Sequence, residues 1–378
     1  MKYFVCQIMI VTTLLCASVY SQTASNHKIY IKPYTDLVDN NWKGIVWEPF
    51  NRDWNSAGTT SDGDQIADCG IQWARVWVTA RKDFSQTDAM VKQCKAQNIQ
   101  IICCYNKSNP HNDLGDSTQQ AEQVNMLKDF VNHYKNVIHY WEIQNEANLD
   151  GSWNLGKEVG RGSNDSESPY NAGVHRFVLW LHLSYDAIKE VDPNATVILG
   201  GISEWIMEDF MDRLTLEHAY NYFDEVAFHP YANNSNPIPD QCIKRLTSFK
   251  NKMSVWPKPK NDMPIWITEI GFHTGSISSP GMVNSETIKA DYLRQTMQKL
   301  IQNLHYSRPI CWYIFHEVNA TNSYYGLINK NLSGSDVKTN FLPAYFSFKG
   351  MDKNWHYYNT IVSLSPGPTG IKTIMKAK

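Results

Sequence analysis

The chain has 378 residues, of which 42% are hydrophobic and 19% charged, and this ordinary globular composition excludes a disordered, collagen-like or coiled-coil protein. Lys and Arg (35) nearly balance Asp and Glu (37), so the net charge of -2 gives no basic surface for nucleic acid and no strongly acidic tail. The chain is rich in aromatic residues, with 13 Trp, 20 Tyr and 14 Phe, and such rings suit stacking on flat ligands as well as core packing.

The N-terminus has the pattern of a signal peptide. Lys2 precedes an apolar run, residues 8–15, that is too short to span a bilayer. The tripeptide 19–21 offers small residues for cleavage, so residues 1–21 are predicted to be removed, and a lipid anchor on Cys16 is the alternative. No later stretch of about 20 apolar residues follows. We therefore expect a secreted monomer, extracellular or periplasmic, with no membrane span.

Six cysteines lie beyond the signal segment, too few in a long chain for a disulfide scaffold. They are Cys69, Cys94, Cys103, Cys104, Cys242 and Cys311. A bridge between Cys69 and Cys94 remains open. Cys103 and Cys104 lie in an apolar, strand-like run, which favours a place in the core over metal binding.

Eight short apolar runs recur along the chain, each followed by a longer stretch. The runs begin at Trp42, Ile71, Ile99, Val137, Thr196, Phe223, Pro264 and Pro309. Helical spacing of apolar residues marks the intervening stretches 88–97, 118–134, 174–191 and 286–304. Strand–helix alternation favours a parallel sheet, and eight units predict an α/β fold of the closed (β/α)8 TIM barrel type. An open doubly wound sheet is the alternative, but no G-x-G-x-x-G follows the first run.

The expected barrel is a single domain over residues 37–352. Between the fourth and fifth runs, residues 151–170 form a polar insertion that is too long for a plain strand-to-helix turn, so we expect a loop over the active face. Residues 353–378 are expected to form a short C-terminal tail that packs on the barrel.

Two of the runs end in glutamates, Glu146 after the fourth and Glu269 in the seventh. In such barrels the reacting groups stand at the C-terminal ends of strands, so both carboxylates are expected in one mouth. A carboxylate at the end of an apolar strand is costly unless it is paired or used. Glycosidic cleavage uses such a pair, one group protonating the leaving oxygen while the other attacks. The alternative is that each glutamate is half of an ion pair at the barrel rim.

The strings WEIQNEAN and WITEIGF, which contain these glutamates, resemble the strand 4 and strand 7 signatures of clan A retaining glycoside hydrolases. Families 39 and 5 are nearest in look, and the order of motifs matches over roughly residues 42–349. The resemblance implies that Glu146 is the acid/base and Glu269 the nucleophile of a double displacement on β-linked oligosaccharides or polysaccharides. It also implies that Asn145 donates to the sugar 2-hydroxyl.

Further positions match the clan one by one. Arg75 resembles the strand 2 arginine that holds the nucleophile ionised, and a rim salt bridge to Glu48 is the alternative. The tripeptide His-Pro-Tyr ends the sixth run as the clan's His-x-Tyr does, which implies that Tyr231 bonds the nucleophile and His229 lines the subsite. Asn106 would contact sugar hydroxyls, unless the N-x-S sequon that it begins carries a glycan.

The eighth and first runs match less closely. Trp312 corresponds to the tryptophan that forms the floor under the bound sugar, with Phe315 as the alternative because His316 and Glu317 extend the run differently. In the first run Glu48 stands where His or Asn is often found. Glu48 is expected to line the site, and the sugar specificity stays open.

Neither a metal nor another cofactor is expected. There is no H-x-H after the first run, no H-E-x-x-H and no cysteine pair at zinc spacing, and an esterase would need a G-x-S-x-G elbow that is missing. Two rival functions remain: a catalytically silent carbohydrate-binding barrel, and a metal-dependent barrel hydrolase. The presence of both glutamates together with Arg75 and Tyr231 argues against the silent barrel.

Overall fold

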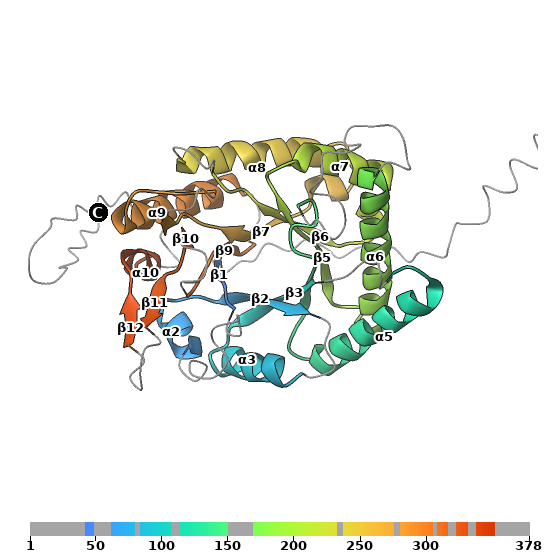
Figure 1. Ribbon diagram of the computed structural model, residues 1–378, viewed down its shortest axis with the longest axis horizontal. Coiled ribbons are helices and arrows are strands. Elements are labelled where there is room, and N and C mark those ends of the chain that lie inside the picture. Colours follow the sequence, from blue (N-terminus) through green and yellow to red (C-terminus); the bar gives the residue numbers. More distant parts are fainter. Residues whose placement is uncertain are drawn as a thin grey trace, which may run out of the picture. The chain divides into compact units, whose positions relative to one another are not determined.

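Eight parallel strands close into a barrel in the order β1-β2-β3-β4-β5-β6-β7-β9 (Figure 1). A computed structural model describes residues 42–48, 62–79, 84–106, 114–149, 169–232, 237–275, 280–304, 308–316, 323–331 and 338–351. The barrel strands are β1 (Lys43–Val46), β2 (Trp73–Thr79), β3 (Gln100–Asn106), β4 (Tyr140–Ile143), β5 (Thr196–Ser203), β6 (Glu225–His229), β7 (Ile265–Ile270) and β9 (Ile310–Trp312). The predicted (β/α)8 barrel is confirmed, and the open doubly wound sheet is wrong because β1 pairs with both β2 and β9.

The helices lie around the outside of the barrel (Figure 1). In the described residues they are α2 (Asp62–Asp68), α3 (Ser85–Ala96), α5 (Ser117–Tyr134), α6 (Pro169–Val191), α7 (Met207–Leu216), α8 (Pro239–Met253), α9 (Glu286–Asn303) and α10 (Pro343–Lys349). All four stretches predicted from helical spacing fall in helices. Asp116 caps the start of α5 with a capping box. Its side chain accepts from the backbone N of Gln119, and the Gln119 side chain accepts from the backbone N of Asp116.

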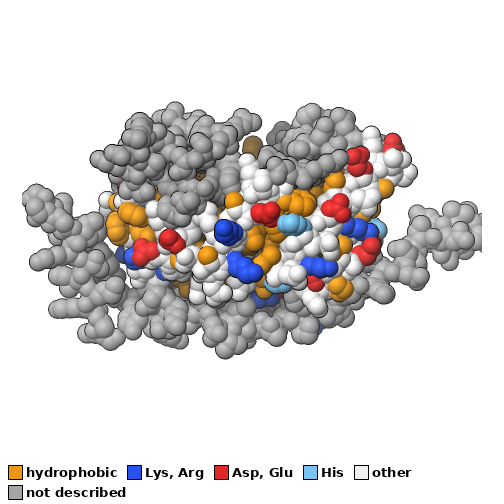
Figure 2. All heavy atoms as spheres, turned by 90° about the horizontal axis from the view of Figure 1, so that it is seen from below, with side chains coloured by type: hydrophobic (Ala, Val, Ile, Leu, Met, Phe, Trp, Pro, Cys, Tyr) orange, Lys and Arg blue, Asp and Glu red, His pale blue; other side chains and the backbone are white. Residues whose placement is uncertain are grey.

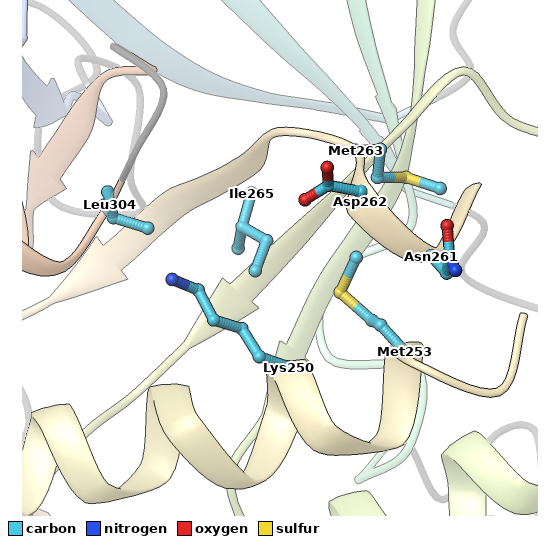
Figure 3. Close-up of a pocket in the computed structure, with 7 residues that line it drawn as sticks. All are labelled: Lys250, Met253, Asn261, Asp262, Met263, Ile265 and Leu304. Atoms are coloured by element: carbon cyan, nitrogen blue, oxygen red, sulfur yellow. The ribbon is translucent and has the colours of Figure 1, made fainter. Parts of the chain in front are cut away.

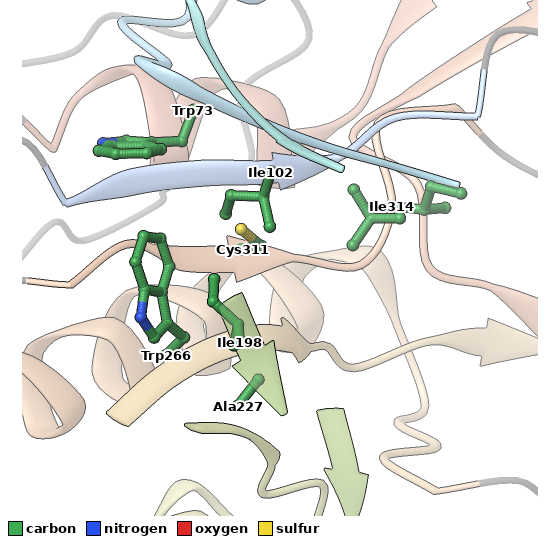
Figure 4. Close-up of a cluster of buried hydrophobic side chains, with 8 residues drawn as sticks. Trp73, Ile102, Ile198, Ala227, Trp266, Cys311 and Ile314 are labelled. Atoms are coloured by element: carbon green, nitrogen blue, oxygen red, sulfur yellow. The ribbon is translucent and has the colours of Figure 1, made fainter. Parts of the chain in front are cut away.

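Apolar side chains fill the barrel interior. Every residue of β5 is buried, which accounts for its unbroken apolar run. Trp73 and Trp266 meet inside the barrel edge to face with ring centroids 5.6 Å apart (Figure 4). Truncating one such ring to alanine costs about 3–5 kcal/mol, so this interior is a packed core on which the site residues above it are held.

Polar groups at the opposite, N-terminal end of the barrel are structural. Arg308 makes two hydrogen bonds to the buried carboxylate of Glu225, which also accepts from the indole of Trp266. A small pocket opens at this end beside the start of β7, where Lys250 and Met253 project from α8 toward Ile265 (Figure 3). In barrels of this type the N-terminal end serves stability, so this pocket is not the candidate site.

The segments after β7 and after β9 carry short strands that the sequence pattern did not predict. Short strands β8 (Thr274–Gly275) and β10 (Ser323–Tyr324) pair antiparallel, and β11 (Ile328–Asn331) and β12 (Lys338–Phe341) form a second two-stranded sheet. The β8–β10 pair joins the segments that follow β7 and β9 at the C-terminal ends of the strands. It therefore belongs to the rim of the barrel mouth.

All six cysteines beyond the signal segment are buried and free. The bridge left open between Cys69 and Cys94 is absent, since both thiols are buried as free cysteines and Cys69 Sγ instead contacts the carbonyl of Tyr345. Cys103 and Cys104 are fully buried in β3, as expected for small core residues.

Several predictions fall on residues that the structure does not describe. These are the signal segment 1–21, the tail 353–378 and nearly all of the polar insertion 151–170. Among the helices of the described stretches, none is both long and apolar enough to cross a membrane. Acidic and basic side chains are interspersed over the described face drawn in Figure 2, in line with the small net charge.

Candidate active site

The two predicted glutamates meet at the C-terminal end of the barrel. Glu146 follows β4 and Glu269 lies near the end of β7. His229 lies at the end of β6. Three atoms lie within 4.8 Å of one another: one carboxylate oxygen of Glu146, one of Glu269 and a ring nitrogen of His229. The barrel thus brings together three residues that are far apart in the sequence, as their positions at strand ends predict.

Arg75 is the centre of the charge network. It is fully buried in β2, and its Nη1 donates to Oε1 of Glu269 at 2.6 Å. Its Nε and Nη2 donate to the two oxygens of Glu142 at 2.6 and 2.9 Å, and Nη2 also donates to Oδ1 of Asn145 at 2.7 Å. The arginine therefore binds the expected nucleophile from inside the barrel rather than acting as a rim residue.

Glu142 is the main site residue that sequence reasoning missed. It is fully buried in β4, where its carboxylate accepts from Arg75, from the backbone N of Gly201 at 2.7 Å and from Oγ1 of Thr268 at 3.2 Å. The Arg75 charge and hydrogen bonds hold the pKa of this carboxyl below its usual value, against the effect of burial. The signal was present: an acidic residue two positions into an apolar strand must point into the barrel with a cation beside it.

The remaining predicted polar residues surround the carboxylates. The Tyr231 hydroxyl donates to Oε2 of Glu269 at 3.1 Å, as the resemblance implies. The backbone N of Asn145 donates to Oδ1 of Asn106 at 2.7 Å. Asn106 thus supports the backbone beside Glu146, a role that the sequence did not predict.

His229 is fully buried and contacts the expected acid/base directly. Its Nδ1 lies 2.9 Å from Oε1 of Glu146 and 3.8 Å from Oε2 of Glu269, and its Nε2 lies 3.0 Å from Oγ1 of Thr268. Burial lowers its pKa to about 4, so the ring is neutral near pH 7.

The two glutamates differ in their surroundings. About a quarter of the Glu146 side chain is exposed, and burial of the carboxyl raises its pKa to about 7. Burial also raises the pKa of Glu269, while His229 and Arg75 pull it down. A carboxyl that keeps its proton up to neutral pH suits a general acid, and one that is bound to a guanidinium and a phenol suits a nucleophile.

The chain enters the site through an unusual turn. Gln144 and Glu146 have positive φ values of 69° and 41°, a region that side-chain-bearing residues rarely occupy and that clusters at functional sites. The turn is locked to β5, because the backbone N of Glu146 donates to the carbonyl of Gly201 at 2.9 Å. A side chain at Gly200 would collide with the backbone of Gln144, so the Gly-Gly pair in β5 is required for this approach.

The predicted sugar floor is not where the sequence placed it. Trp312 and Phe315 are both fully buried, and the indole of Trp312 donates to the carbonyl of Tyr325 at 3.0 Å. Neither ring offers a face to the mouth. Tyr313 is partly exposed, and burial and then the charges of Glu48 and Glu269 raise the pKa of its hydroxyl. Tyr313 and Glu48 therefore lie close to each other at the site.

Metal binding has a geometric basis here. Among the described residues, Glu146, His229 and Glu269 are the group of side chains close enough to share one ion. These groups already have hydrogen-bond partners in the protein: His229 contacts Glu146, and Glu269 accepts from Arg75 and Tyr231. The cation beside Glu269 is the Arg75 guanidinium. The hydrogen bonds of these three groups are therefore made within the protein.

The comparisons with known proteins concern the family and the fold. Residues 178–341 match the family model of the glycosyl hydrolase catalytic core, a stretch that runs from α6 to β12 and includes Glu269. The resemblance to glycoside hydrolases is confirmed. No curated protein matches the sequence.

Solved structures with the same fold include several glycosidases. A β-glucuronidase of Bacteroides uniformis is similar over 76% of this chain and 33% of its own length, with 12% identity and a TM-score of 0.56. A β-glucosidase of Exiguobacterium marinum is similar over 77% and 86%, with 12% identity and a TM-score of 0.55. Aphid myrosinase is similar over 84% and 99%, with 10% identity and a TM-score of 0.57. The chain spans about a third of the glucuronidase, and identities this low establish the shared barrel alone.

Proposed function

We propose that the protein is a retaining glycoside hydrolase that cleaves β-glycosidic bonds by double displacement. The observation that carries the proposal is the short separation of the two carboxylates, with an oxygen of Glu146 and one of Glu269 within 4.8 Å. Retaining enzymes hold their carboxyl groups about 5–5.5 Å apart, whereas inverting enzymes need roughly 6.5–9.5 Å to admit a water. The spacing here supports the retaining rather than the inverting arrangement.

In the first step Glu269 attacks the anomeric carbon and forms a glycosyl ester, while Glu146 gives its proton to the departing glycosidic oxygen. In the second step the ionised Glu146 takes a proton from water, whose oxygen attacks the same carbon and releases Glu269. Two inversions restore the configuration of the substrate. Arg75 and Tyr231 hold Glu269 in position for both steps.

The pKa of Glu146 must change between the steps. In the free enzyme burial and the charge of Glu142 favour the protonated acid. An ionised Glu269 beside it acts in the same direction, and forming the ester removes the Glu269 charge. The raised pKa of about 7 suits the acid role near neutral pH. Asn145, whose Oδ1 is fixed by Arg75, leaves its amide group for a sugar hydroxyl beside Glu269.

The proposed substrate is a β-linked oligosaccharide or polysaccharide, in line with the β-glucosidase and β-glucuronidase names of the similar structures. Tyr313 takes the place of Trp312 as the proposed floor, because it is partly exposed at the eighth strand end whereas Trp312 and Phe315 are fully buried. The predicted secretion after loss of residues 1–21, the monomeric state and the tail 353–378 remain part of this proposal.

Hydrolysis of a panel of aryl β-glycosides and polysaccharides tests the proposal, with the anomer first released followed by proton NMR. The expected product is the β-anomer, and first release of the α-anomer would contradict retention. A carbohydrate-binding barrel without catalysis would bind polysaccharide and release nothing. A metal-dependent hydrolase would lose its activity in EDTA, whereas the two-carboxylate mechanism predicts unchanged rates.

A further inference from the structure

A chain of hydrogen bonds connects the buried carboxylate of Glu142 to the expected acid/base. Thr268 Oγ1 lies 3.2 Å from Oε1 of Glu142 and 3.0 Å from Nε2 of His229. On the other side of the ring, Nδ1 lies 2.9 Å from Oε1 of Glu146. Glu142, Thr268 and His229 are fully buried, so water does not compete for these bonds. Neither Glu142 nor Thr268 takes part in the two displacement steps.

The charge of Glu142 fixes the direction of the first bond. Arg75 binds both of its oxygens, and the backbone N of Gly201 donates to Oε1 as well, so this carboxylate is ionised and can only accept. A threonine hydroxyl has one proton. The Thr268 proton therefore goes to Glu142, and the Thr268 oxygen is left to accept from His229.

That bond in turn fixes the tautomer of the histidine. To donate to Thr268, His229 must carry a proton on Nε2. The titratable groups around the ring are Glu146 and Glu269 on its Nδ1 side, with Arg75 and Glu142 beyond. The buried ring is neutral, because its pKa lies well below neutral pH. Nδ1 is then an unprotonated acceptor, and its partner Glu146 must supply the proton of their hydrogen bond.

We propose that Glu142 and Thr268 are positioning residues that act through His229 to keep Glu146 in its protonated, acid form. The inference rests on the proposed function for its catalytic meaning, and the proton positions follow from the hydrogen-bond geometry together with the neutral state of the buried ring. After Glu146 has given its proton to the leaving group, its carboxylate faces the lone pair of Nδ1. This contact makes Glu146 a stronger base for the water of the second step, which returns the proton.

The ring of His229 packs closely against the backbone of Gly201. A Cβ added at Gly201 would lie 1.9 Å from Nε2 of His229, so the glycine backbone is pressed against the ring. The same residue donates its N–H to Glu142. Gly201 therefore contacts both Glu142 and the ring of His229, and its lack of a side chain leaves the space that the ring occupies beside Thr268.

Nitrogen-15 NMR of the histidine-labelled, full-length protein tests the tautomer directly. Comparison with His229→Gln assigns the His229 signals among those of the 12 histidines. We expect a neutral ring with its proton on Nε2 at pH 6–7. A proton on Nδ1, or a doubly protonated ring, would overturn the proposal whether or not the protein hydrolyses glycosides.

Variants at Thr268 test the consequence. In Thr268→Val the ring is free to carry its proton on Nδ1 and donate to an ionised Glu146. The carbon-13 titration of the Glu146 carboxyl should therefore shift down by about one to two pH units, the equivalent of one hydrogen bond to a charged group. The basic limb of the kcat/KM profile should move with it. Glycosides with poor leaving groups should lose more activity than activated aryl glycosides.

Thr268→Ser keeps a hydroxyl and should restore both the titration and the pH limb. Thr296→Val is the matched control for a buried threonine, since Thr296 lies in α9 and its hydroxyl makes no hydrogen bond. If Thr268 has only a structural role, Thr268→Val should lower the activity on all substrates alike and leave the Glu146 titration unchanged. That result would overturn the proposal. If the wild-type protein hydrolyses no glycoside, the proposed function fails. The His229 tautomer and the Glu146 titration still test whether Glu142 and Thr268 act on Glu146 through His229.

Discussion

Arg75 and Glu269 form an ion pair inside the barrel, with Nη1 of the arginine 2.6 Å from Oε1 of the glutamate and both side chains almost fully buried. The same guanidinium is bound at its other edge by Glu142. One cation thus serves two carboxylates, one structural and one expected to react. Removing charges from water is costly, so this arrangement is retained only where each group has its full set of hydrogen bonds.

Arg75→Lys should break the simultaneous binding of Glu142 and Glu269 by one side chain. A lysine keeps the charge but lacks the planar fork, so it cannot bond Glu142 and Glu269 together. Loss of one hydrogen bond to a charged group costs about 1.5–3 kcal/mol, which corresponds to a loss of roughly 10- to 100-fold in kcat/KM and a lower Tm. Steady-state kinetics and thermal unfolding measure both effects.

Arg213→Lys is the control, because Arg213 pairs with Glu217 one turn away in a partly exposed position. Such pairs contribute about 0.3–0.5 kcal/mol, so its Tm and kinetics should stay close to those of the wild type. Equal effects at the two positions would contradict the role given to the Arg75 fork.

The activity should fall as the pH rises through about 7, because Glu146 must be protonated to act as the acid and its pKa is about 7. Glu146→Gln should abolish this limb of the kcat/KM profile along with most of the activity. A basic limb that persists with the same midpoint in Glu146→Gln would assign the titration to another group.

The same raised pKa predicts a trend in stability. The folded state binds the Glu146 proton more tightly than the unfolded state does, so the stabilisation is present below pH 4.5 and is lost as the pH rises through about 7. The difference in free energy of unfolding between Glu146→Gln and the wild type should therefore shift in favour of the variant across this range. Denaturant unfolding at several pH values measures it.

The fold and the reacting pair could be predicted because they depend on patterns that repeat along the chain. Eight apolar runs imply the barrel, and its geometry then brings Glu146 and Glu269 together. Glu142 and Thr268 were missed because their roles depend on which side chain faces them across the barrel. The floor was misplaced for the same kind of reason, since the turn after β9 decides whether Trp312 or Tyr313 faces the mouth.

Gly201→Ala should disrupt the site without touching a reacting group. The added Cβ would lie 1.9 Å from Nε2 of His229, so the ring or β5 must move. We expect a loss of about 10²-fold in kcat, as is common when a positioned group is displaced by about 1 Å. Gly350→Ala, whose Cβ would meet its nearest atom, the Phe346 carbonyl oxygen, at 3.3 Å, is the control and should leave kcat unchanged. Full activity in Gly201→Ala would show that the His229 position is unimportant.

Trp205 is a candidate platform for the leaving group. Its side chain is 69% exposed just after β5, and Asn148, two residues beyond Glu146, holds its carbonyl at 2.7 Å. The neighbouring residue Glu204 lies close to Glu146. Burial, with a contribution from the Glu146 charge, raises the pKa of Glu204 to about 7. Since aromatic stacking contributes about 0.5–1.5 kcal/mol, Trp205→Ala should raise KM about 2- to 12-fold for long oligosaccharides.

Val255→Ala provides the comparison for Trp205→Ala. Val255 is 66% exposed just after α8, at the far end of the barrel, and its truncation should leave KM unchanged. Unchanged KM for every substrate in Trp205→Ala would remove Trp205 from the site.

The roles of the two glutamates can be separated with azide and an activated aryl glycoside. Glu146→Ala removes proton donation, which a good leaving group hardly needs, so the ester on Glu269 should still form. Its hydrolysis then lacks a base, and azide should release the sugar as the β-azide after two inversions. Glu269→Ala should block the first step, and azide in the vacated space should give the α-azide by one inversion. Without azide, loss of the acid/base is typically about 10²- to 10⁴-fold. The coupling constant of the anomeric proton in each product identifies the anomer. Swapped outcomes would reverse the two roles, and full activity in both variants would make the glutamates structural.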